Sequence, residues 1–304
     1  MTGLQRYLAE EVAVDHADGF IPRREALRCL TLLGLSVTAA TALLAACADG
    51  EGGGPSDATT PPALPAGATT TASGEAAPVA TEAITFPGPQ GRTLQGAWAA
   101  ARRPRGGVLV IHENRGLTDH IRQVAGRFAA DGFTALALDL LSEEGGTASL
   151  GDPAQATAAL SRVPQERFVA DMRAGLDELA RRARGGKLAA VGFCFGGGMV
   201  WLLLASGEPR LAAAVPFYGP LPDGADLSGS KAAVLGIYAE LDTRVNASRD
   251  AARAALERAG LPHELVTFPG AGHAFFNDTG ARYDPGAAAE AYRRVLAWFG
   301  RHLA

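Results

Sequence analysis

Cysteine is scarce in this chain of 304 residues, which contains only Cys29, Cys47 and Cys194. The first lies in an apolar N-terminal segment, the second at the end of that segment, and the third in a glycine-rich turn. Because the three settings are unlike one another, the sequence predicts no framework of disulfide bonds. Each cysteine therefore needs its own interpretation.

Metal-binding and dinucleotide-binding motifs are also missing. The sequence has neither H-E-x-x-H nor C-x-x-C spacing, and His112-Glu113 lacks the partner histidine of a zinc motif. No glycine-rich fingerprint is followed by a suitable acidic residue, so we expect no metal and no cofactor. The formal net charge of -4 shows no excess of positive charge, and we expect no nucleic acid as a partner.

Residues 1–46 have the features of an export signal. Arg23-Arg24 precede an apolar run over residues 30–46, which contains no acidic residue and is short for a membrane-spanning helix. The paired arginines resemble a twin-arginine signal, although Pro22 and Ala26 depart from the usual pattern. The alternative is an uncut N-terminal membrane helix.

The apolar run ends in Leu44-Ala45-Ala46-Cys47, which resembles a bacterial lipobox. Such signals are cut before the cysteine, whose thiol carries the lipid, so the resemblance implies an exported protein anchored to the membrane through Cys47. Residues 47–82 would be the lipidated cysteine and a flexible linker, because their glycine-, proline- and threonine-rich stretches cannot build a core. We expect residues 83–304 to form one folded domain and the protein to be a monomer.

Apolar runs alternate with helical patterns along this predicted domain. Strands are expected at residues 93–100, 107–112, 132–139, 187–192, 211–218, 232–238 and 263–268, and helices at 119–131, 165–184, 199–205, 246–259 and 285–303. The repeated alternation predicts an α/β fold, with a mostly parallel central sheet and helices on both faces. Sheets of this kind place their functional sites at the carboxyl ends of the strands.

The strongest motif is Gly192-Phe193-Cys194-Phe195-Gly196, which is the G-x-S-x-G nucleophile elbow with cysteine in place of serine. Glycines two residues either side of the nucleophile allow a sharp turn from strand to helix. The positive end of the helix dipole then favours a thiolate at Cys194. The alternative is a buried structural cysteine in a glycine-rich turn.

The chain order of the remaining residues supports a catalytic triad. Asp242 follows the strand predicted at 232–238, and His273 follows the strand predicted at 263–268. This is the order nucleophile, acid, histidine of an α/β-hydrolase. His273 would take the thiol proton, and Asp242 would orient the imidazole. Glu240 is the alternative acid.

A further candidate is the loop His112-Glu113-Asn114-Arg115-Gly116, which follows a buried strand. Loops in this position supply an oxyanion donor, so the backbone N–H groups of Phe195 and Asn114 are the predicted oxyanion hole. Glu113 would place a carboxyl group close to the thiol. Its alternative role is an ion pair with Arg115.

These motifs together resemble the dienelactone hydrolase family. The resemblance rests on a cysteine in the elbow, a glutamate in the first strand's loop and the sequence Gly-His-Ala-Phe near the C-terminus, and it covers residues 84–303. It implies an α/β-hydrolase fold with Cys194 as nucleophile, Asp242 as acid, His273 as base and Glu113 as the loop carboxylate. In that family the glutamate is proposed to bind the resting thiol and to help deprotonate it when substrate enters.

One departure from the family bears on the substrate. Well-known members hold the carboxylate of a dienelactone with two arginines, one of them four residues after the triad histidine. Here that position is Asn277. The second arginine precedes the long central helix, where Arg162 and Arg167 are both candidates. Loss of an arginine removes a bidentate carboxylate clamp.

The sequence therefore predicts an enzyme that cleaves a small ester or lactone through a thioester, with an activity like that of carboxymethylenebutenolidase. A broad carboxylesterase or thioesterase would use the same residues. A third alternative is a lipid-anchored binding protein that has kept the fold without turnover, because fold alone does not determine function.

Overall fold

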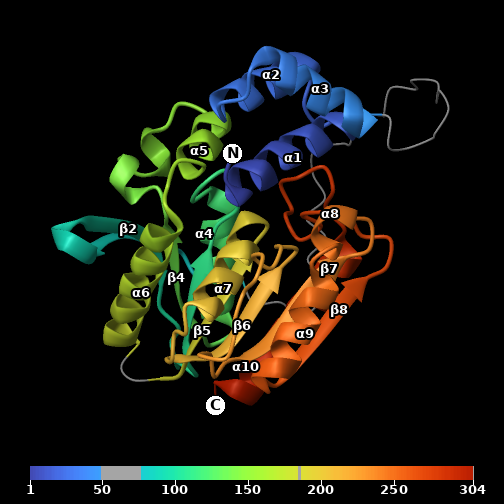
Figure 1. The fold of residues 1–304 in the computed structure, drawn as a ribbon. Helices are drawn as coiled ribbons and strands as arrows, with labels where there is room; N and C mark the ends of the chain where they lie inside the picture. The colour runs from blue at the N-terminus through green and yellow to red at the C-terminus, as the bar shows by residue number, and fades with distance from the viewer. Residues whose placement is uncertain (49–76, 184–185, 304) are drawn as a thin grey trace. The chain divides into compact units, whose positions relative to one another are not determined.

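The computed structural model describes residues 1–48, 77–183 and 186–303 (Figure 1). The chain divides into two compact units, Met1–Ala77 and Pro78–Ala304. Most of the linker predicted at residues 47–82 lies outside the described residues. The second unit includes residues before the predicted start at 83, since the N–H of Val79 donates a hydrogen bond to the carbonyl of Gly126.

Three helices make up the first unit: α1 (Gly3–Ala17), α2 (Arg23–Leu32) and α3 (Val37–Ala48). They share a small apolar core that includes Leu8, Leu30 and Leu44. The apolar run predicted at residues 30–46 is thus divided between two helices.

The division has a local cause at Gly34. This glycine has a φ of 92°, and its N–H bonds to the carbonyl of Thr31 while the N–H of Leu35 bonds to that of Leu30. The pair of bonds is a Schellman motif, which ends α2. Among the described helices, none is long and apolar enough to cross a membrane. The export signal and lipid anchor stay predictions.

The second unit contains an eight-stranded sheet in the order β1-β2-β4-β3-β5-β6-β7-β8. Pairing is antiparallel between β1 and β2 and between β2 and β4, and parallel elsewhere. The strands are β1 (Glu82–Pro87), β2 (Thr93–Ala99), β3 (Gly107–Ile111), β4 (Thr134–Asp139), β5 (Leu188–Phe193), β6 (Leu211–Phe217), β7 (Ala233–Ala239) and β8 (His263–Phe268).

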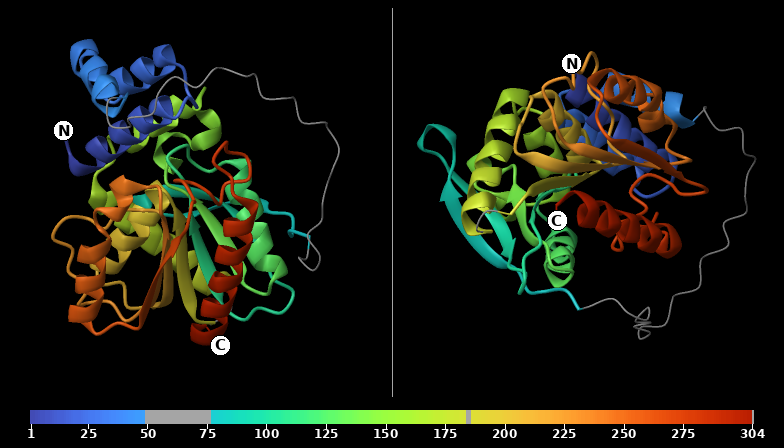
Figure 2. Two further views of the ribbon diagram at one scale, coloured as in Figure 1. Left: turned by 90° about the vertical axis from the view of Figure 1, so that its right-hand side faces the viewer. Right: turned by 90° about the horizontal axis from the view of Figure 1, so that it is seen from below.

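Helices cover both faces of the sheet, as predicted (Figure 2). One face carries α4 (Asp119–Ala130) and α10 (Pro285–His302), whose aromatic side chains Phe128 and Phe299 pack together. The other face carries α6 (Gln165–Arg182), α7 (Phe195–Ala205) and α9 (Arg249–Ala259). The sheet interior is apolar because β3, β4 and β5 are buried along their whole length.

Two helices differ from their predicted bounds. The helix predicted to begin at residue 199 begins at Phe195, so that Gly196, Gly197 and Gly198 are helical. The helix predicted at 246–259 is two helices, α8 (Thr243–Asn246) and α9. Asp242 caps α8 by accepting a hydrogen bond from the N–H of Val245 at 3.2 Å. The sequence pattern also did not predict β1 or α5 (Pro153–Leu160).

The strand register brings the loops of interest to one edge of the sheet. Ile111 of β3 lies opposite Gly192 of β5, and Phe193 lies opposite Phe217 of β6. Ala239 of β7 lies opposite Phe268 of β8. The loops after β3, β5, β7 and β8 therefore begin side by side, where a parallel sheet builds its site.

Candidate active site

Cys194 occupies the turn between β5 and α7 with a φ of 56° and a ψ of -118°. Few residues other than glycine adopt a positive φ, and such strain is concentrated at functional sites. The N–H of Cys194 is fixed by a hydrogen bond to the carbonyl of Phe217 at 3.1 Å. The backbone at the predicted nucleophile therefore has the strained turn of a nucleophile elbow.

The two outer glycines of the motif are required by close packing. A Cβ atom on Gly192 would lie 2.1 Å from the carbonyl oxygen of Gly196. A Cβ atom on Gly196 would lie 2.4 Å from the carbonyl oxygen of Ile111 and 2.6 Å from that of His112. Glycine is thus needed because α7 starts in contact with the ends of β3 and β5.

His273 and Asp242 are joined, as the triad prediction requires. Nδ1 of His273 is hydrogen-bonded to Oδ2 of Asp242, and both side chains are buried. The rival acid Glu240 instead accepts a hydrogen bond from the N–H of Gly270 at 2.7 Å. Its carboxylate therefore supports the loop that carries His273.

The imidazole of His273 also lies close to the cysteine. One ring nitrogen of His273 lies within 4.8 Å of Sγ of Cys194. Nδ1 is engaged by Asp242, so Nε2 is the nitrogen available for proton transfer with the sulfur. The structure therefore brings the three predicted triad residues together.

Tyr218 belongs to the same cluster and was not predicted. Its ring meets the imidazole of His273 edge-on, with ring centroids 5.1 Å apart. It has a φ of 33°, and its N–H bonds to the carbonyl of Ile237 at 2.7 Å. The only sequence signal was an aromatic residue at the end of a predicted strand. Tyr218 packs the catalytic histidine candidate from one side.

The loop that follows β3 is shaped by His112. Its Nε2 accepts a hydrogen bond from the N–H of Leu140 at 3.1 Å, so its Nδ1 donates to the carbonyl of Glu113 at 2.6 Å. Burial lowers the pKa of His112, although the charge of Asp139 opposes this effect. His112 is a neutral imidazole that orients the loop.

The carboxylate of Glu113 is bound by the loop that follows His273. Its Oε2 accepts a hydrogen bond from Nδ2 of Asn277 at 2.6 Å. Burial raises the pKa of Glu113, although His120, Asn277, His273 and Arg115 each oppose that rise. Within the described residues, Glu113 is hydrogen-bonded to Asn277 and not to the sulfur of Cys194.

The predicted oxyanion donors lie on neighbouring segments. Phe195 is the first residue of α7, where a helix leaves backbone N–H groups without intrahelical acceptors. Asn114 follows Glu113, and its carbonyl accepts a hydrogen bond from Oγ1 of Thr157 in α5 at 3.1 Å. The part of these two N–H groups in binding an oxyanion stays a prediction.

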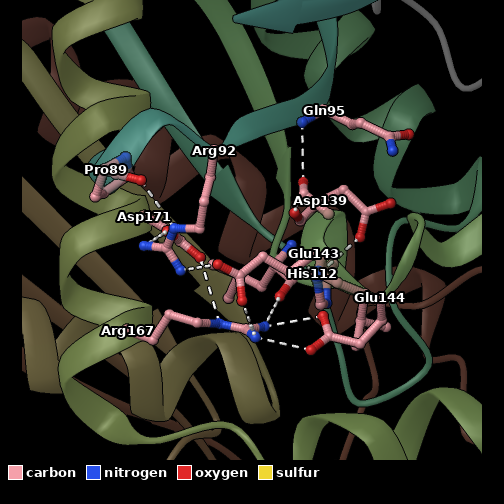
Figure 3. A network of polar contacts seen from close by, with 12 residues as sticks. Pro89, Arg92, Gln95, His112, Asp139, Glu143, Glu144, Arg167 and Asp171 are labelled. Atoms are coloured by element: carbon pink, nitrogen blue, oxygen red, sulfur yellow. Dashed lines mark hydrogen bonds and ion pairs between the residues drawn. The ribbon is translucent and has the colours of Figure 1, made fainter. Parts of the chain in front are cut away.

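The arginine candidates for a carboxylate clamp are not equivalent. Arg167 donates to the carboxylates of Glu143 and Glu144, each at 2.7 Å, and lies 3.7 Å from a carboxylate oxygen of Asp171 (Figure 3). Arg92 binds Glu143 and Asp171 in the same network. Arg167 is therefore engaged by protein carboxylates.

Arg162, the other candidate, is an exposed residue just after α5. At the remaining clamp position, Oδ1 of Asn277 accepts from the N–H and the hydroxyl of Thr279, while its Nδ2 binds Glu113. Asn277 thus uses both ends of its amide within the protein.

The described residues of the second unit hold no set of three His, Cys, Asp or Glu side chains close enough to one another to bind one metal ion. The expectation of an enzyme without a metal or a cofactor stays a prediction.

Comparison with known proteins identifies the family of this chain. The family model described as "Dienelactone hydrolase family" matches residues 94–303. A protein of Salmonella typhi named "Putative carboxymethylenebutenolidase" is 34% identical over 212 residues, which is 64% of this chain and 77% of that protein.

Two solved structures extend the comparison. The structure described as "Putative Dienelactone Hydrolase" from Klebsiella pneumoniae has 31% identity and a TM-score of 0.63, covering 73% of this chain and 99% of its own. A dienelactone hydrolase-like promiscuous phosphotriesterase from metagenomic libraries has 26% identity and a TM-score of 0.65, covering 74% of this chain and all of its own. The predicted fold is confirmed, and the chain belongs to the dienelactone hydrolase family of the α/β-hydrolase superfamily.

Proposed function

We propose that the protein hydrolyses an uncharged ester or lactone, with Cys194 as nucleophile, His273 as general base and Asp242 as the residue that orients the histidine. The observation that carries this proposal is the strained turn at Cys194 together with the Asp242–His273 hydrogen bond and the short approach of imidazole and sulfur. A nucleophile near a base that a third residue orients is the arrangement typical of covalent catalysis.

The proposed reaction has two steps. The sulfur of Cys194 attacks the carbonyl carbon while the thiol proton passes to His273, and the carbon–oxygen bond then breaks as His273 protonates the leaving alkoxide. Water next attacks the thioester and gives a proton to His273. The carbon–sulfur bond breaks, the sulfur regains its proton from His273, and the new carboxyl group gives its acidic proton to the carboxylate of Glu113 and leaves as a carboxylate.

Charge that develops on the carbonyl oxygen would be stabilised by the N–H groups of Phe195 and Asn114. The position of Phe195 at the start of α7 supports its part, because helix N-termini present unpaired N–H groups. Each such donor typically lowers the barrier by about 3 kcal/mol.

Glu113 would control the thiol. Its raised pKa favours the protonated, neutral form of the carboxyl group, and this form can donate a hydrogen bond to sulfur. Entry of substrate would move Glu113 towards Cys194, where its carboxylate form would help His273 to deprotonate the thiol. A resting thiol is less easily oxidised than a thiolate.

The proposed preference for an uncharged substrate rests on Asn277 and Arg167, the residues at two positions where a carboxylate clamp was considered. Asn277 carries no charge and is bound to Glu113 and Thr279, while Arg167 is bound to Glu143 and Glu144. A substrate carboxylate would gain no bidentate partner at either position and would face the carboxylate of Glu113.

The test is a panel of p-nitrophenyl esters of increasing acyl length beside a carboxylated dienelactone and its methyl ester. We expect kcat/KM for the methyl ester to exceed that for the carboxylate by at least tenfold. A neutral phosphotriester belongs in the panel because one structural relative is described as a promiscuous phosphotriesterase. Preference for the carboxylated lactone would contradict the uncharged-substrate proposal.

The panel also separates the alternatives. Turnover of long acyl esters or acyl thioesters at the highest kcat/KM would indicate a carboxylesterase or a thioesterase. Absence of turnover on the whole panel, with no labelling of Cys194 by a thiol-reactive ester probe, would indicate a binding protein. Labelling of the peptide that contains Cys194 in the wild type, with no such labelling in Cys194→Ala, would support the proposal that the protein is an enzyme.

We further propose that residues 1–46 are an export signal and that the protein is anchored outside the cytoplasm through lipid on Cys47. Three features support this in the right order: the pair Arg23-Arg24, the apolar run that follows and the sequence Leu44-Ala45-Ala46-Cys47. A membrane-held enzyme would meet small esters that arrive from outside the cell.

A further inference from the structure

A second buried imidazole, that of His120, is linked to Glu113 through the loop that carries Asn277 and Asp278. His120 is in the first turn of α4, is only 2% exposed, and its Nδ1 is hydrogen-bonded to Oδ1 of Asp278 at 2.8 Å. The side chain of Asp278 is 43% exposed, so this carboxylate is open to water. His120 therefore connects a buried position with a solvent-exposed acid.

The loop after His273 holds both partners. Consecutive residues bind Glu113 and His120, because Asn277 donates to Oε2 of Glu113 and Asp278 bonds to the imidazole. The loop is fixed by backbone bonds from Asn277 to Ala274 at 3.0 Å and from Gly280 to Asn277 at 3.0 Å. The two side chains are thus held by one rigid turn.

Each of these side chains has one polar atom left over. Among the described residues, Oε1 of Glu113 and Nε2 of His120 are buried and have no hydrogen-bond partner. A buried polar atom without a partner is destabilising, and its presence in a folded protein calls for a functional explanation. His120 is close enough to Glu113 that a positive charge on its imidazole would lower the pKa of that carboxyl group more than His273 or Arg115 does. A potential donor and a potential acceptor are therefore neighbours in the same buried region.

We propose that His120 and Asp278 form a proton relay that connects Glu113 with solvent. The proposal rests on the role of Glu113 proposed above. At neutral pH each ester hydrolysed yields a carboxylate and one proton, so a proton must leave the buried site in every turnover. In the relay, Glu113 gives its proton to Nε2 of His120 while Nδ1 of His120 gives its own to Asp278, which releases it to water.

The step conserves protons and charge. One O–H bond breaks at Glu113 and one N–H bond forms at Nε2, while one N–H bond breaks at Nδ1 and one O–H bond forms at Asp278. His120 begins and ends neutral with the other tautomer, which return transfer or ring rotation resets. Because it acts through Glu113, His120 is a positioning residue for that carboxyl group.

The experiment compares His120→Gln and Asp278→Asn with wild type and with Arg122→Gln, a matched control on the same helix. His120→Gln keeps a polar group of similar reach that cannot carry a proton. We expect kcat to fall about 10²-fold in His120→Gln and less in Asp278→Asn, with KM nearly unchanged. The solvent deuterium isotope effect on kcat should rise in both variants and stay at the wild-type value in Arg122→Gln.

A second readout does not require turnover. The rate at which iodoacetamide alkylates Cys194, followed by mass spectrometry of its peptide, reports thiol ionisation from pH 5 to 9. The pKa of Glu113 depends on His120, His273 and Arg115. Because Glu113 is proposed to act on the thiol, His120→Gln should shift the pH at which the alkylation rate rises, whereas Arg122→Gln should not.

The outcomes separate the two proposals. Wild-type turnover combined with unchanged isotope effects and alkylation profiles in both relay variants would overturn the relay and leave the hydrolase proposal intact. A displaced alkylation profile in a protein that hydrolyses nothing on the panel would support the contact between His120 and Glu113 and overturn the hydrolase proposal. Equal thermal unfolding midpoints would show that the variants are folded.

Discussion

Nδ1 of His273 is hydrogen-bonded to Oδ2 of Asp242, 31 positions earlier in the chain. The bond fixes one tautomer of the imidazole, with its proton on the side of the carboxylate. Nε2 is thereby left as the basic atom, and a ring nitrogen of His273 lies within 4.8 Å of Sγ of Cys194. A pair that only stabilised the fold would not need to approach a cysteine in a strained turn.

Substitution of any member of this group should stop turnover. We expect Cys194→Ala and His273→Ala to lower kcat on the best p-nitrophenyl ester by at least about 10³-fold, and Asp242→Asn by a comparable factor. Cys29→Ala, in the first unit, should leave kcat unchanged. If purified Cys194→Ala or His273→Ala keeps most of the activity, the triad assignment is wrong.

Two glycines of α7 allow a matched comparison that tests the close packing of the nucleophile elbow. Gly196→Ala would place a Cβ 2.4 Å from a backbone oxygen of Ile111, so we expect a loss of about 3 kcal/mol in the free energy of unfolding. The nearest atom to a Cβ on Gly198 is 3.7 Å away, and Gly198→Ala should stabilise the helix by about 0.5–1 kcal/mol. Denaturant unfolding measures both. Equal effects of the two substitutions would rule out the packing explanation.

The free energy of unfolding should depend on pH through the protonation of Asp171. Two guanidinium groups, Arg92 and Arg167, face the three carboxylates of Asp171, Glu143 and Glu144 (Figure 3). Burial raises the pKa of Asp171 to about 6, although Arg92 and Arg167 oppose the rise. The folded protein therefore holds this proton more tightly than the unfolded chain. Its stabilising contribution is complete below pH 4 and is lost as the pH rises through 6.

Asp171→Asn should remove this dependence. The difference in unfolding free energy between wild type and variant should change by on the order of 2–3 kcal/mol between pH 4 and pH 7, in favour of the variant at the higher pH. Asp177→Asn on the same helix is the control, because the side chain of Asp177 is 72% exposed. A constant difference across the pH range would show that folding does not raise the pKa of Asp171.

The lipid-anchor proposal is tested by Cys47→Ser. Loss of the thiol removes the only attachment point of the predicted lipid, so we expect the variant to move from the membrane to the soluble fraction. Metabolic labelling with a radioactive fatty acid should mark the wild type and not the variant. Membrane association of an unlabelled variant would point to another means of attachment.

Much of the sheet could be predicted because its strands are continuous apolar runs. The strands after residues 107 and 187 are buried on both faces, so neither has polar interruptions that would obscure it. The first residue of one strand was predicted wrongly. Gly132 was predicted to begin β4, but it has a φ of 90° and its carbonyl accepts a hydrogen bond from the N–H of Arg105. It therefore belongs to the turn before the strand.

The start of α7 could not be predicted from helix propensity. Three consecutive glycines, Gly196 to Gly198, disfavour a helix on their own. Glycine is nevertheless required at the start of this helix, because a Cβ on Gly196 or Gly197 would collide with backbone oxygens of neighbouring strands. That requirement comes from packing between segments distant in sequence, and no local pattern reports it.

The proposed triad could be predicted because each of its members follows a strand in a known order. The surroundings of Glu113 were not. Asn277 binds Glu113 across 164 positions, and Asp278 binds His120 across 158. Such pairs arise from the arrangement of loops around the sheet edge, and the identities of the residues alone do not indicate them. Arg167 was a plausible substrate clamp by position, but its acidic partners appear only in the folded chain.

The strand order has a consequence for how the protein would lose activity. β5, which leads to Cys194, has a neighbour on each side and is buried throughout, whereas β8, which leads to His273, is an edge strand that is mostly half-buried. Opening at a sheet edge requires less free energy than global unfolding. Warming would therefore detach the base from an otherwise intact nucleophile, and inactivation would precede melting and be reversible on cooling.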